Sequence, residues 1–504
     1  MAVFQSNGTS CLQSLTVIWE VGQMRTTIAV LATMLAVAGA APSVLSQASS
    51  QEIAEHQQAA QQAEARDDFA RAVEEYRLLT TWLPDNGQVW SNLGVALYFH
   101  NEFDRAADVM RHAIALNREL YSPHLFLGLS EARLSQPDSA IAELKKAIAI
   151  NGADVLPHTW LGYEYVAQSN YERAVEQLKI ASKSDAHNAD IWYVLGQCYL
   201  DDDKEAIRQL WRVAPDGGRT WQLAAEQFEI QGSKDGALRA YLGALKRRPD
   251  VAAIKEKIIA LGGSVPVSAA KPAGPTAPED VAYERVREYE REAKAAFEQV
   301  SEIDPDSSRA HQIQGDSDVA ADRFDDAISE YKAALAHNDR LPGVHGALCY
   351  AMSRVGQLQD ALGECDKEIE IAPYSAEAYV AAGRVHLLAN NDAKAEALLT
   401  KATTLDRPPV VAFKFLSQIY AREQKYPDAV RVLRKYLAEE KTDSAAYYLL
   451  ARACKYTGDT EGMNEAIAAF KRTSEAAKNT SEAHKALTAD PYGNDPSAAG
   501  EQKD

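Results

Sequence analysis

A 34-residue period is the feature that most constrains how this chain can fold. One set of glycines and two sets of alanines recur at this interval, in the same register (Gly94, Gly128, Gly162 and Gly196; Ala106, Ala140 and Ala174; Ala113, Ala147 and Ala181). Only 27 of the 504 residues are glycine, so chance does not explain the spacing. A fixed period of this length is typical of stacked structural repeats.

Each repeat unit contains two amphipathic helices. In the unit 87–120, the pattern predicts helices over about 89–100 and 104–116, joined by a turn at 101–103. Small residues occupy unit positions 8, 20 and 27, and large apolar residues occupy positions 4, 7, 11, 17 and 24. Small side chains let two helices approach closely, and the large ones fill the remaining space.

The residues at these positions resemble the signature of the tetratricopeptide repeat family (Trp90, Leu93, Gly94, Leu97, Phe103, Ala106, Met110 and Ala113). The resemblance covers most of the chain. It implies an all-α fold, an α-solenoid of helix-turn-helix repeats in two arrays that form a right-handed superhelix. It also implies that the first helix of each unit lines a concave groove.

The first predicted array spans 53–262. It begins with a degenerate unit, 53–86, and ends with a capping helix at 251–261. The unit 189–217 is shortened around residues 201–204. Residues 263–280 are rich in proline and alanine, which predicts a semi-rigid linker.

The second predicted array spans 281–472. It starts with a single helix, 283–303, that is similar to the second half of a unit. Full units follow at 308–341, 342–375, 376–409, 410–443 and 444–472. Residues 473–504 are small and polar, which predicts a disordered tail.

Residues 1–48 are interpreted as a leader. Arg25 precedes the apolar run 26–40, and small residues follow it, the pattern of a secretory signal peptide. Cleavage is predicted after Ala48, and a start at Met24 would give a signal of normal form. Export makes the protein periplasmic or secreted. The alternative is an uncleaved segment that holds the chain at a membrane.

Charge and motifs exclude several functions. The net charge of -19 argues against nucleic acid or an anionic membrane as the main partner. The chain has no phosphate-binding loop, no dinucleotide fingerprint, no zinc-protease motif and no nucleophile elbow. The repeats leave no stretch long enough for a catalytic domain. We therefore predict no enzyme activity, no cofactor and no small-molecule substrate.

Histidines and cysteines recur at defined unit positions. His124, His158, His311 and His345 all occupy position 4, which suggests either metal or pH-sensing sites, or histidines that pack where tryptophan usually does. Equivalent atoms of stacked repeats lie about 10 Å apart, too far for one zinc ion, so packing is favoured and no metal is predicted.

Four cysteines follow the leader. Cys349 and Cys365 lie on the two helices of one unit, so a disulfide is conceivable after export. Buried free cysteine is the more common arrangement in such cores. Cys198 and Cys454 also fall at largely inward-facing positions.

The resemblance places unit positions 2, 5, 9, 12 and 13 in the groove. In the first array these positions carry apolar and aromatic residues and, toward its end, acidic ones (Tyr98, Phe99, Leu125, Leu129, Tyr163 and Tyr193; Asp190, Asp201, Glu226 and Glu229). In the second array they carry a basic stripe with interleaved tyrosines (Arg309, Arg354, Arg384, Lys414, Arg422, Arg452 and Lys455; Tyr350, Tyr448 and Tyr456).

The basic stripe is the predicted binding site. Arginine attracts carboxylates through paired hydrogen bonds, and tyrosine adds rigid contact area. We expect an extended peptide with acidic groups or a C-terminal carboxylate. The alternative is that the cations balance acidic residues on neighbouring helices. The Lys–Asn clamp of some family members is not reproduced, because Gln418 follows Lys414 four positions later.

The sequence thus predicts an exported scaffold that binds other proteins or peptides in its concave grooves. The alternative is an envelope-assembly or secretion accessory factor that its N-terminal segment holds near the membrane.

Overall fold

The computed structural model describes residues 48–479, apart from 135, 231, 266–276, 374, 406–407 and 442. The predicted leader up to residue 47, most of the predicted linker and the tail beyond residue 479 lie outside these ranges. Within them every regular element is an α-helix, and successive helix pairs stack, so the predicted all-α solenoid is confirmed. No helix in the described ranges is long and apolar enough to cross a membrane.

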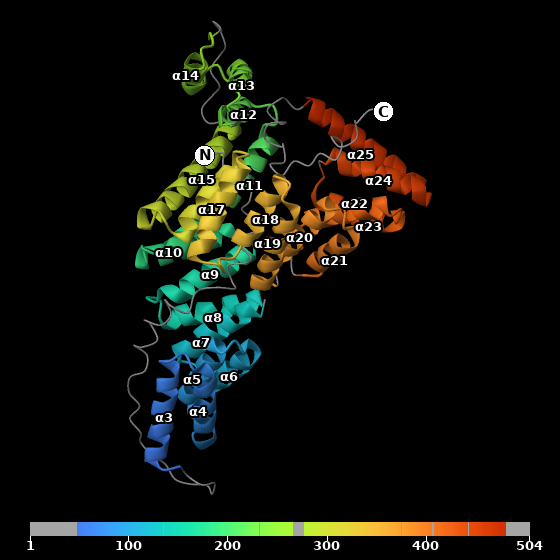
Figure 1. Ribbon diagram of the computed structural model, residues 1–504. Coiled ribbons are helices and arrows are strands. Elements are labelled where there is room, and N and C mark those ends of the chain that lie inside the picture. Colours follow the sequence, from blue (N-terminus) through green and yellow to red (C-terminus); the bar gives the residue numbers. More distant parts are fainter. Residues whose placement is uncertain are drawn as a thin grey trace. The chain divides into compact units, whose positions relative to one another are not determined.

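The chain forms two compact units, and the boundary between them falls between Val194 and Leu195. This boundary lies inside helix α11 (Ala189–Val213). The N-terminal unit contains eight further described helices in antiparallel pairs (Figure 1): α3 (Ser50–Glu64), α4 (Phe69–Trp82), α5 (Gly87–Phe99), α6 (Phe103–Leu116), α7 (Tyr121–Arg133), α8 (Pro137–Ile150), α9 (Val155–Ala167) and α10 (Tyr171–Ser184).

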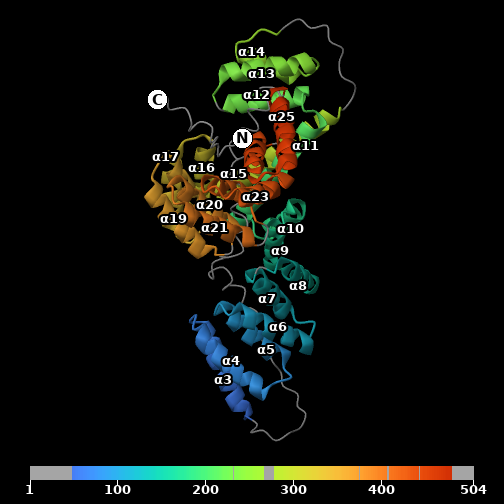
Figure 2. The ribbon, with the colours of Figure 1, turned by 90° about the vertical axis from the view of Figure 1, so that its right-hand side faces the viewer.

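The C-terminal unit contains the rest of α11 and the remaining described helices (Figures 1 and 2). These are α12 (Gly218–Ile230), α13 (Lys234–Arg247), α14 (Ala252–Ala260), α15 (Pro278–Ile303), α16 (Ser308–Ala320), α17 (Phe324–His337), α18 (Val344–Arg354), α19 (Leu358–Ile371), α20 (Ala376–Leu388), α21 (Asp392–Thr404), α22 (Val411–Arg422), α23 (Tyr426–Glu439), α24 (Ser444–Thr457) and α25 (Thr460–Asn479). Helix α25 thus continues beyond the expected end at residue 472.

A left-handed residue at unit position 15 closes the first helix of most units. This residue has positive φ in nine units (Asp67, Asn101, Ser169, Gly232, Asp322, Gly356, Asn390, Gln424 and Gly458). In the unit 87–120 the backbone N–H of Glu102 then donates to the carbonyl of Leu97 at 2.9 Å, which completes a Schellman motif. The chain reverses there, and the second helix returns alongside the first.

The small residue at position 8 lets these two helices touch. A Cβ added to Gly128 would lie 2.9 Å from Leu144, which is at position 24 of the same unit. The equivalent contacts are as close in four other units (Gly94 with Met110, Gly162 with Leu178, Gly315 with Tyr331, and Gly383 with Leu399). The predicted role of the small residues is therefore confirmed.

We expect Gly162→Leu to lower the free energy of unfolding by about 1–3 kcal/mol, because overpacking forces the helices apart. The Cβ alone would lie 2.7 Å from Leu178 Cγ. Gly363→Leu is a matched control, since a Cβ there meets nothing within 4 Å. Denaturant unfolding compares the two variants, and equal midpoints would contradict the assigned register.

The unit that begins at residue 189 departs from this plan. Helix α11 runs without a break through residues 201–204, the stretch around which the sequence predicts a shortened unit. A Cβ on Gly196, at position 8, would lie 2.6 Å from Phe297 of α15. If the 34-residue numbering is extended back from residue 308, Phe297 occupies position 24 of the preceding unit. Helix α15 therefore supplies the second helix of this unit.

Further contacts show that α11 and α15 are antiparallel. The rings of Tyr199 and Tyr289 lie 6.5 Å apart. Tyr199 follows Gly196 along α11, whereas Tyr289 precedes Phe297 along α15. Farther along α11, Leu210 shares a hydrophobic cluster with Tyr283 and Val286 of α15. Residue numbers thus rise along one helix as they fall along the other, as in the two helices of a repeat.

Helices α12–α14 lie in sequence between the halves of this split unit, and α12 and the residue after α13 contact the first turns of α15. The hydroxyl of Tyr283 donates to Glu226 of α12 at 2.7 Å. Arg219 and Arg248 both donate to Asp280, at 2.6 and 2.8 Å. The sequence predicts that α15 belongs to a second array beyond a linker, whereas in the structure its packing partners include α11 and α12 of the first.

Candidate functional site

The aromatic groove residues predicted in the N-terminal half are packed into the fold. Tyr163 and Tyr193 are fully buried, and Tyr98 is 5% exposed. The Tyr98 ring contacts the rings of Phe99, Phe103 and Phe126. These side chains therefore hold neighbouring helices together and offer little surface to a peptide.

The predicted acidic groove residues are also used within the fold. Asp201 is buried and pairs with Lys204 at 2.8 Å. Glu226 accepts a hydrogen bond from Tyr283, and Glu229 accepts one from Tyr241 and pairs with Lys257. These contacts join helices α12–α15 to one another.

Two arginines of the basic stripe enclose a buried tyrosine. The guanidinium of Arg384 lies 4.5 Å from the centre of the Tyr350 ring. Arg354 donates to the Tyr350 hydroxyl at 2.7 Å and stacks on Phe324 at 4.4 Å. Burial raises the pKa of Tyr350, against the effect of both guanidinium groups. The two arginines thus contact aromatic rings within the fold.

Three more cations of the stripe have partners on their own or neighbouring helices. Lys414 pairs with Asp443 at 3.0 Å, and Arg422 pairs with Asp392 at the same distance. Burial raises the pKa of Asp443, but the N–H of Ala446 and the Lys414 ammonium outweigh it, and the net shift is downward. Arg309 is buried and donates to Gln312. The charge-balancing alternative therefore describes Lys414 and Arg422.

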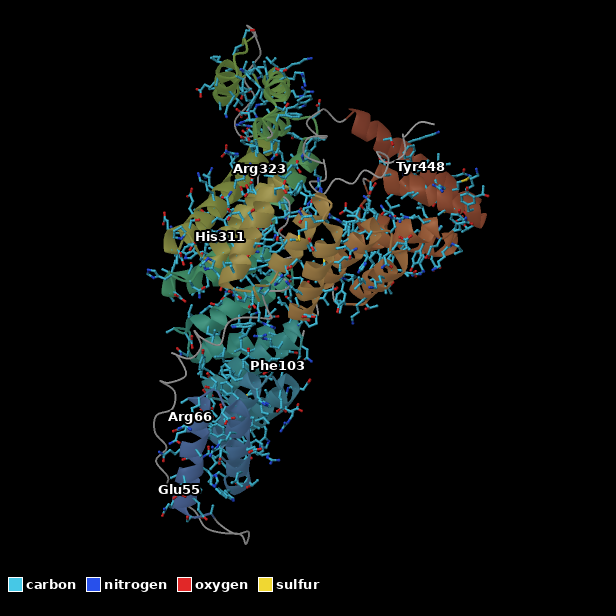
Figure 3. All side chains as sticks on the ribbon, viewed as in Figure 1. Glu55, Arg66, Phe103, His311, Arg323 and Tyr448 are labelled. Carbon is cyan, nitrogen blue, oxygen red and sulfur yellow. A yellow bond between two sulfur atoms is a disulfide. The ribbon has the colours of Figure 1, made fainter. Side chains whose placement is uncertain are left out.

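Helix α24 carries the exposed part of the predicted stripe. Tyr448, Arg452, Lys455 and Tyr456 follow one another at spacings that place them on one helix face. The two tyrosines are 55% and 58% exposed, and both cations are exposed. The Tyr456 ring stacks on Tyr426 at 4.3 Å, and Tyr448, labelled in Figure 3, lies near Phe470. We call these four residues the α24 face.

A family model matches the chain in two stretches. The model describes a tetratricopeptide repeat, and it matches residues 56–120 and 161–209. Each stretch includes a helix pair with one of the glycine contacts described above, at Gly94 and at Gly162. The chain therefore contains tetratricopeptide repeats. Its fold is that of a protein-interaction scaffold, which is typically non-enzymatic.

Several solved structures are similar in part, among them two tetratricopeptide repeat proteins. A thermophilic one from Thermus thermophilus is 17% identical and covers 53% of this chain and 100% of its own, with a TM-score of 0.33. One from Parabacteroides merdae is 12% identical, with coverages of 66% and 98% and a TM-score of 0.37. PilF of Pseudomonas aeruginosa is 19% identical, with coverages of 40% and 90% and a TM-score of 0.34. No curated protein sequence matches.

Most histidines at position 4 of the tetratricopeptide repeats contact the loop that follows the preceding helix. His124 places Nε2 3.1 Å from the carbonyl oxygen of Arg118, six residues earlier, and Nδ1 2.7 Å from Glu143. His158 and His345 have equivalent contacts. Trp90 donates to the carbonyl six residues earlier in the same way. At these positions histidine therefore takes the place of tryptophan.

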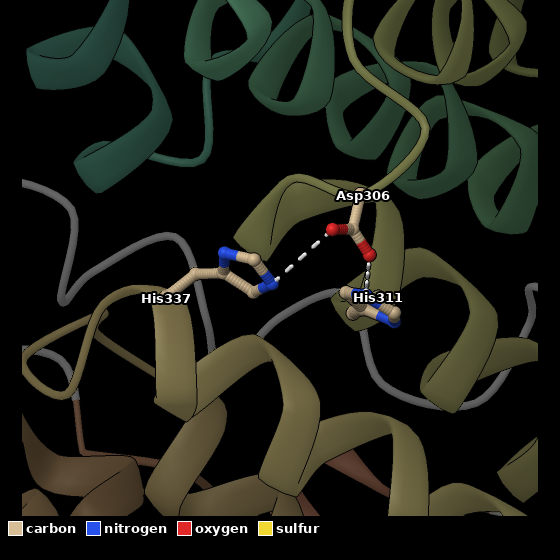
Figure 4. Close-up of side chains that lie close together, drawn as sticks. All are labelled: Asp306, His311 and His337. Atoms are coloured by element: carbon tan, nitrogen blue, oxygen red, sulfur yellow. Dashed lines mark hydrogen bonds and ion pairs between the residues drawn. The ribbon is translucent and has the colours of Figure 1, made fainter.

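His311 is different. Its Nδ1 contacts Glu330 at 2.7 Å as expected, but its Nε2 lies 3.1 Å from the carboxylate of Asp306. His337, at the end of α17, lies 3.8 Å from the same carboxylate (Figure 4). Sequence reasoning missed Asp306 and His337, because neither occupies a signature position and only folding brings them to His311.

Cys349 and Cys365 form a disulfide, with their Cα atoms 5.4 Å apart. They occupy positions 8 and 24, the pair that is in contact in the other units. Cys198 and Cys454 are buried free thiols. Burial raises the pKa of both thiols, and nearby carboxylates act in the same direction. Neither has the character of a catalytic thiolate.

Buried carboxyl groups form a further set that the sequence analysis did not single out. Glu164 of α9 is 2% exposed, and its Oε1 has no hydrogen-bond partner among the described residues. Burial raises its pKa to about 8. Asp316 of α16 accepts a hydrogen bond from Tyr331, and burial raises its pKa to about 7.

Proposed function

We propose that this protein is an exported scaffold that binds an extended, acidic segment of a partner protein on the α24 face. The observation that carries the proposal is the exposure of two cations and two tyrosines on one side of a single helix. The other cations of the basic stripe contact acidic, aromatic or amide side chains within the fold.

The α24 face suits such a partner for three reasons. Arg452 and Lys455 have no ion-pair partner among the described residues, so they can pair with carboxylates of a ligand. Exposed tyrosine rings give contact area with little loss of side-chain entropy. Finally, a basic patch on a chain of net charge -19 is a local exception that favours acidic ligands over basic ones.

Charge reversal at Arg452→Glu and Lys455→Glu tests the proposal. The probe is a labelled peptide of alternating glutamate and alanine, and fluorescence anisotropy measures its affinity. We expect the double variant to bind about tenfold more weakly or worse, since two charge-assisted contacts become repulsive. Binding to the unaltered protein should weaken with added salt.

A matched control reverses Arg208 and Arg212 of α11, which are 65% and 70% exposed. The change in net charge is the same, so a general electrostatic effect would weaken binding equally in both variants. That result, or unchanged partners and salt sensitivity in pull-downs from a native envelope fraction, would rule out the α24 face. Arg384 is unsuitable for this test because it packs on Tyr350.

Two observations support export. The disulfide between Cys349 and Cys365 is of a kind that persists in oxidising compartments. The first described helix, α3, has Ser49 as its N-cap, paired with Glu52 in a capping box. Predicted cleavage after Ala48 would leave this cap intact. N-terminal sequencing of the mature protein decides between cleavage and the alternative, an accessory factor held at the membrane by residues 26–40.

A further inference from the structure

We infer that Asp306, His311 and His337 form a binding site for a zinc ion. One ligand atom from each residue can be chosen so that all three lie within 4.8 Å of one another. Figure 4 shows Asp306 between the two imidazole rings. The three side chains come from the loop before α16, from α16 itself and from the last turn of α17.

Comparison with the other repeats separates His311 from its counterparts. In His124 and His345, Nε2 faces a backbone carbonyl oxygen of the preceding loop, and Nδ1 faces a glutamate, so both ring nitrogens are used within the repeat. In His311 the same atom faces a carboxylate, beside a second imidazole. The nitrogen that serves as a structural contact elsewhere is therefore aimed at a potential metal ligand here.

Glu330 provides the outer contact that zinc-binding histidines usually have. Its Oε2 lies 2.7 Å from Nδ1 of His311. A carboxylate in this place holds the proton on Nδ1, so the lone pair of Nε2 points to the opposite side. That side carries Asp306, at 3.1 Å. His311 is thus oriented before any ion binds.

The remaining two ligands have freedom to close around an ion. The side chain of Asp306 is 78% exposed and that of His337 is 45% exposed, whereas that of His311 is 21% exposed. The two rings are near parallel, at 18°, with centres 5.7 Å apart. Zinc bonds of about 2.0–2.2 Å require the ligand atoms to approach one another slightly, which exposed side chains can do by rotation.

The ligand set selects the class of metal. Two imidazoles and one carboxylate suit Zn²⁺, with a fourth position for water, and they are a poor set for Ca²⁺ or Mg²⁺, which prefer oxygen ligands. A bound ion would be shared by the two imidazoles and the Asp306 carboxylate. It would link the end of α17 to the loop between α15 and α16.

Titration calorimetry with ZnCl₂ at pH 7.5 tests the site, on the full chain purified without a histidine tag. We expect saturable binding of one ion per chain, and no comparable binding of MgCl₂ or CaCl₂. His337→Ala and Asp306→Asn alter exposed residues and should abolish this binding without unfolding the chain. Glu330→Gln should weaken it about 10–100-fold, as other outer-contact changes do.

His345→Ala is the matched control. His345 occupies the same unit position and contacts Glu364 in the same way, but its Nε2 faces a carbonyl. Zinc affinity should be unchanged in this variant. Zinc binding that persists in both His337→Ala and Asp306→Asn, or no saturable binding to the unaltered chain, would overturn the proposal.

Discussion

Replacing Phe297 with alanine is expected to lower the free energy of unfolding of the C-terminal compact unit by about 3–5 kcal/mol, the usual cost of removing a buried aromatic ring. The Phe297 side chain is 4% exposed and lies against Gly196. It is the contact by which α15 completes the repeat that α11 begins. Removal of the ring leaves a cavity between α11 and α15.

A double-mutant cycle isolates this contact. Gly196→Ala alone should destabilise the chain, because the new Cβ would lie 2.6 Å from the Phe297 ring. In the Phe297→Ala background the same change should stabilise it, since the space is open and alanine favours helix over glycine by about 1 kcal/mol. Denaturant unfolding with hydrogen exchange of α11 and α15 measures both effects. Additive changes would show that the two residues do not meet.

The second large effect is a fall in stability with rising pH that depends on Glu164. Its pKa is raised from an ordinary value of 4.5 to about 8 by burial. Between these values the folded chain holds a proton that the unfolded chain has released. Stability therefore falls as pH rises through this window and levels off above about pH 8. From pH 6 to pH 9 the expected loss is about 3 kcal/mol.

Glu164→Gln separates this effect from those of other buried acids. Glutamine has the same shape and stays neutral. Between pH 6 and pH 9 the free energy of unfolding of the variant should therefore fall by about 3 kcal/mol less than that of the unaltered chain. Repeat arrays unfold in parts, so hydrogen exchange of α9 and α10 is the suitable measurement. If the stability of both proteins changed with pH in the same way, Glu164 would not be the group responsible.

Much of the fold could be predicted because the repeat contacts are local. Gly128 and Leu144 lie in the same helix pair and touch whatever the rest of the chain does. For the same reason, cysteines at positions 8 and 24 of one unit lie close enough to bond. The exposed α24 face was also among the residues that the groove positions predict.

The other groove residues were harder to predict, because unit position gives the direction of a side chain and not what covers it. Tyr98 and Tyr163 stand at groove positions, yet aromatic neighbours cover the first and the second is fully buried. Lys414 stands in the basic stripe, yet Asp443 of the next helix neutralises it. Burial and pairing depend on neighbouring units, whose identities the period does not specify.

The period, the helix pairs and the close contacts at position 8 were determined by the sequence alone, since each depends on residues within one unit. The course of α11 was decided by tertiary structure. Asp203 stands at position 15, where Asp67 and Asp322 adopt the left-handed conformation that ends a helix, yet α11 continues through it. The second helix of this unit comes from α15, far along the chain. Distant packing thus overrides a local turn, because burying Phe297 against Gly196 outweighs the small preference of an aspartate for one backbone conformation.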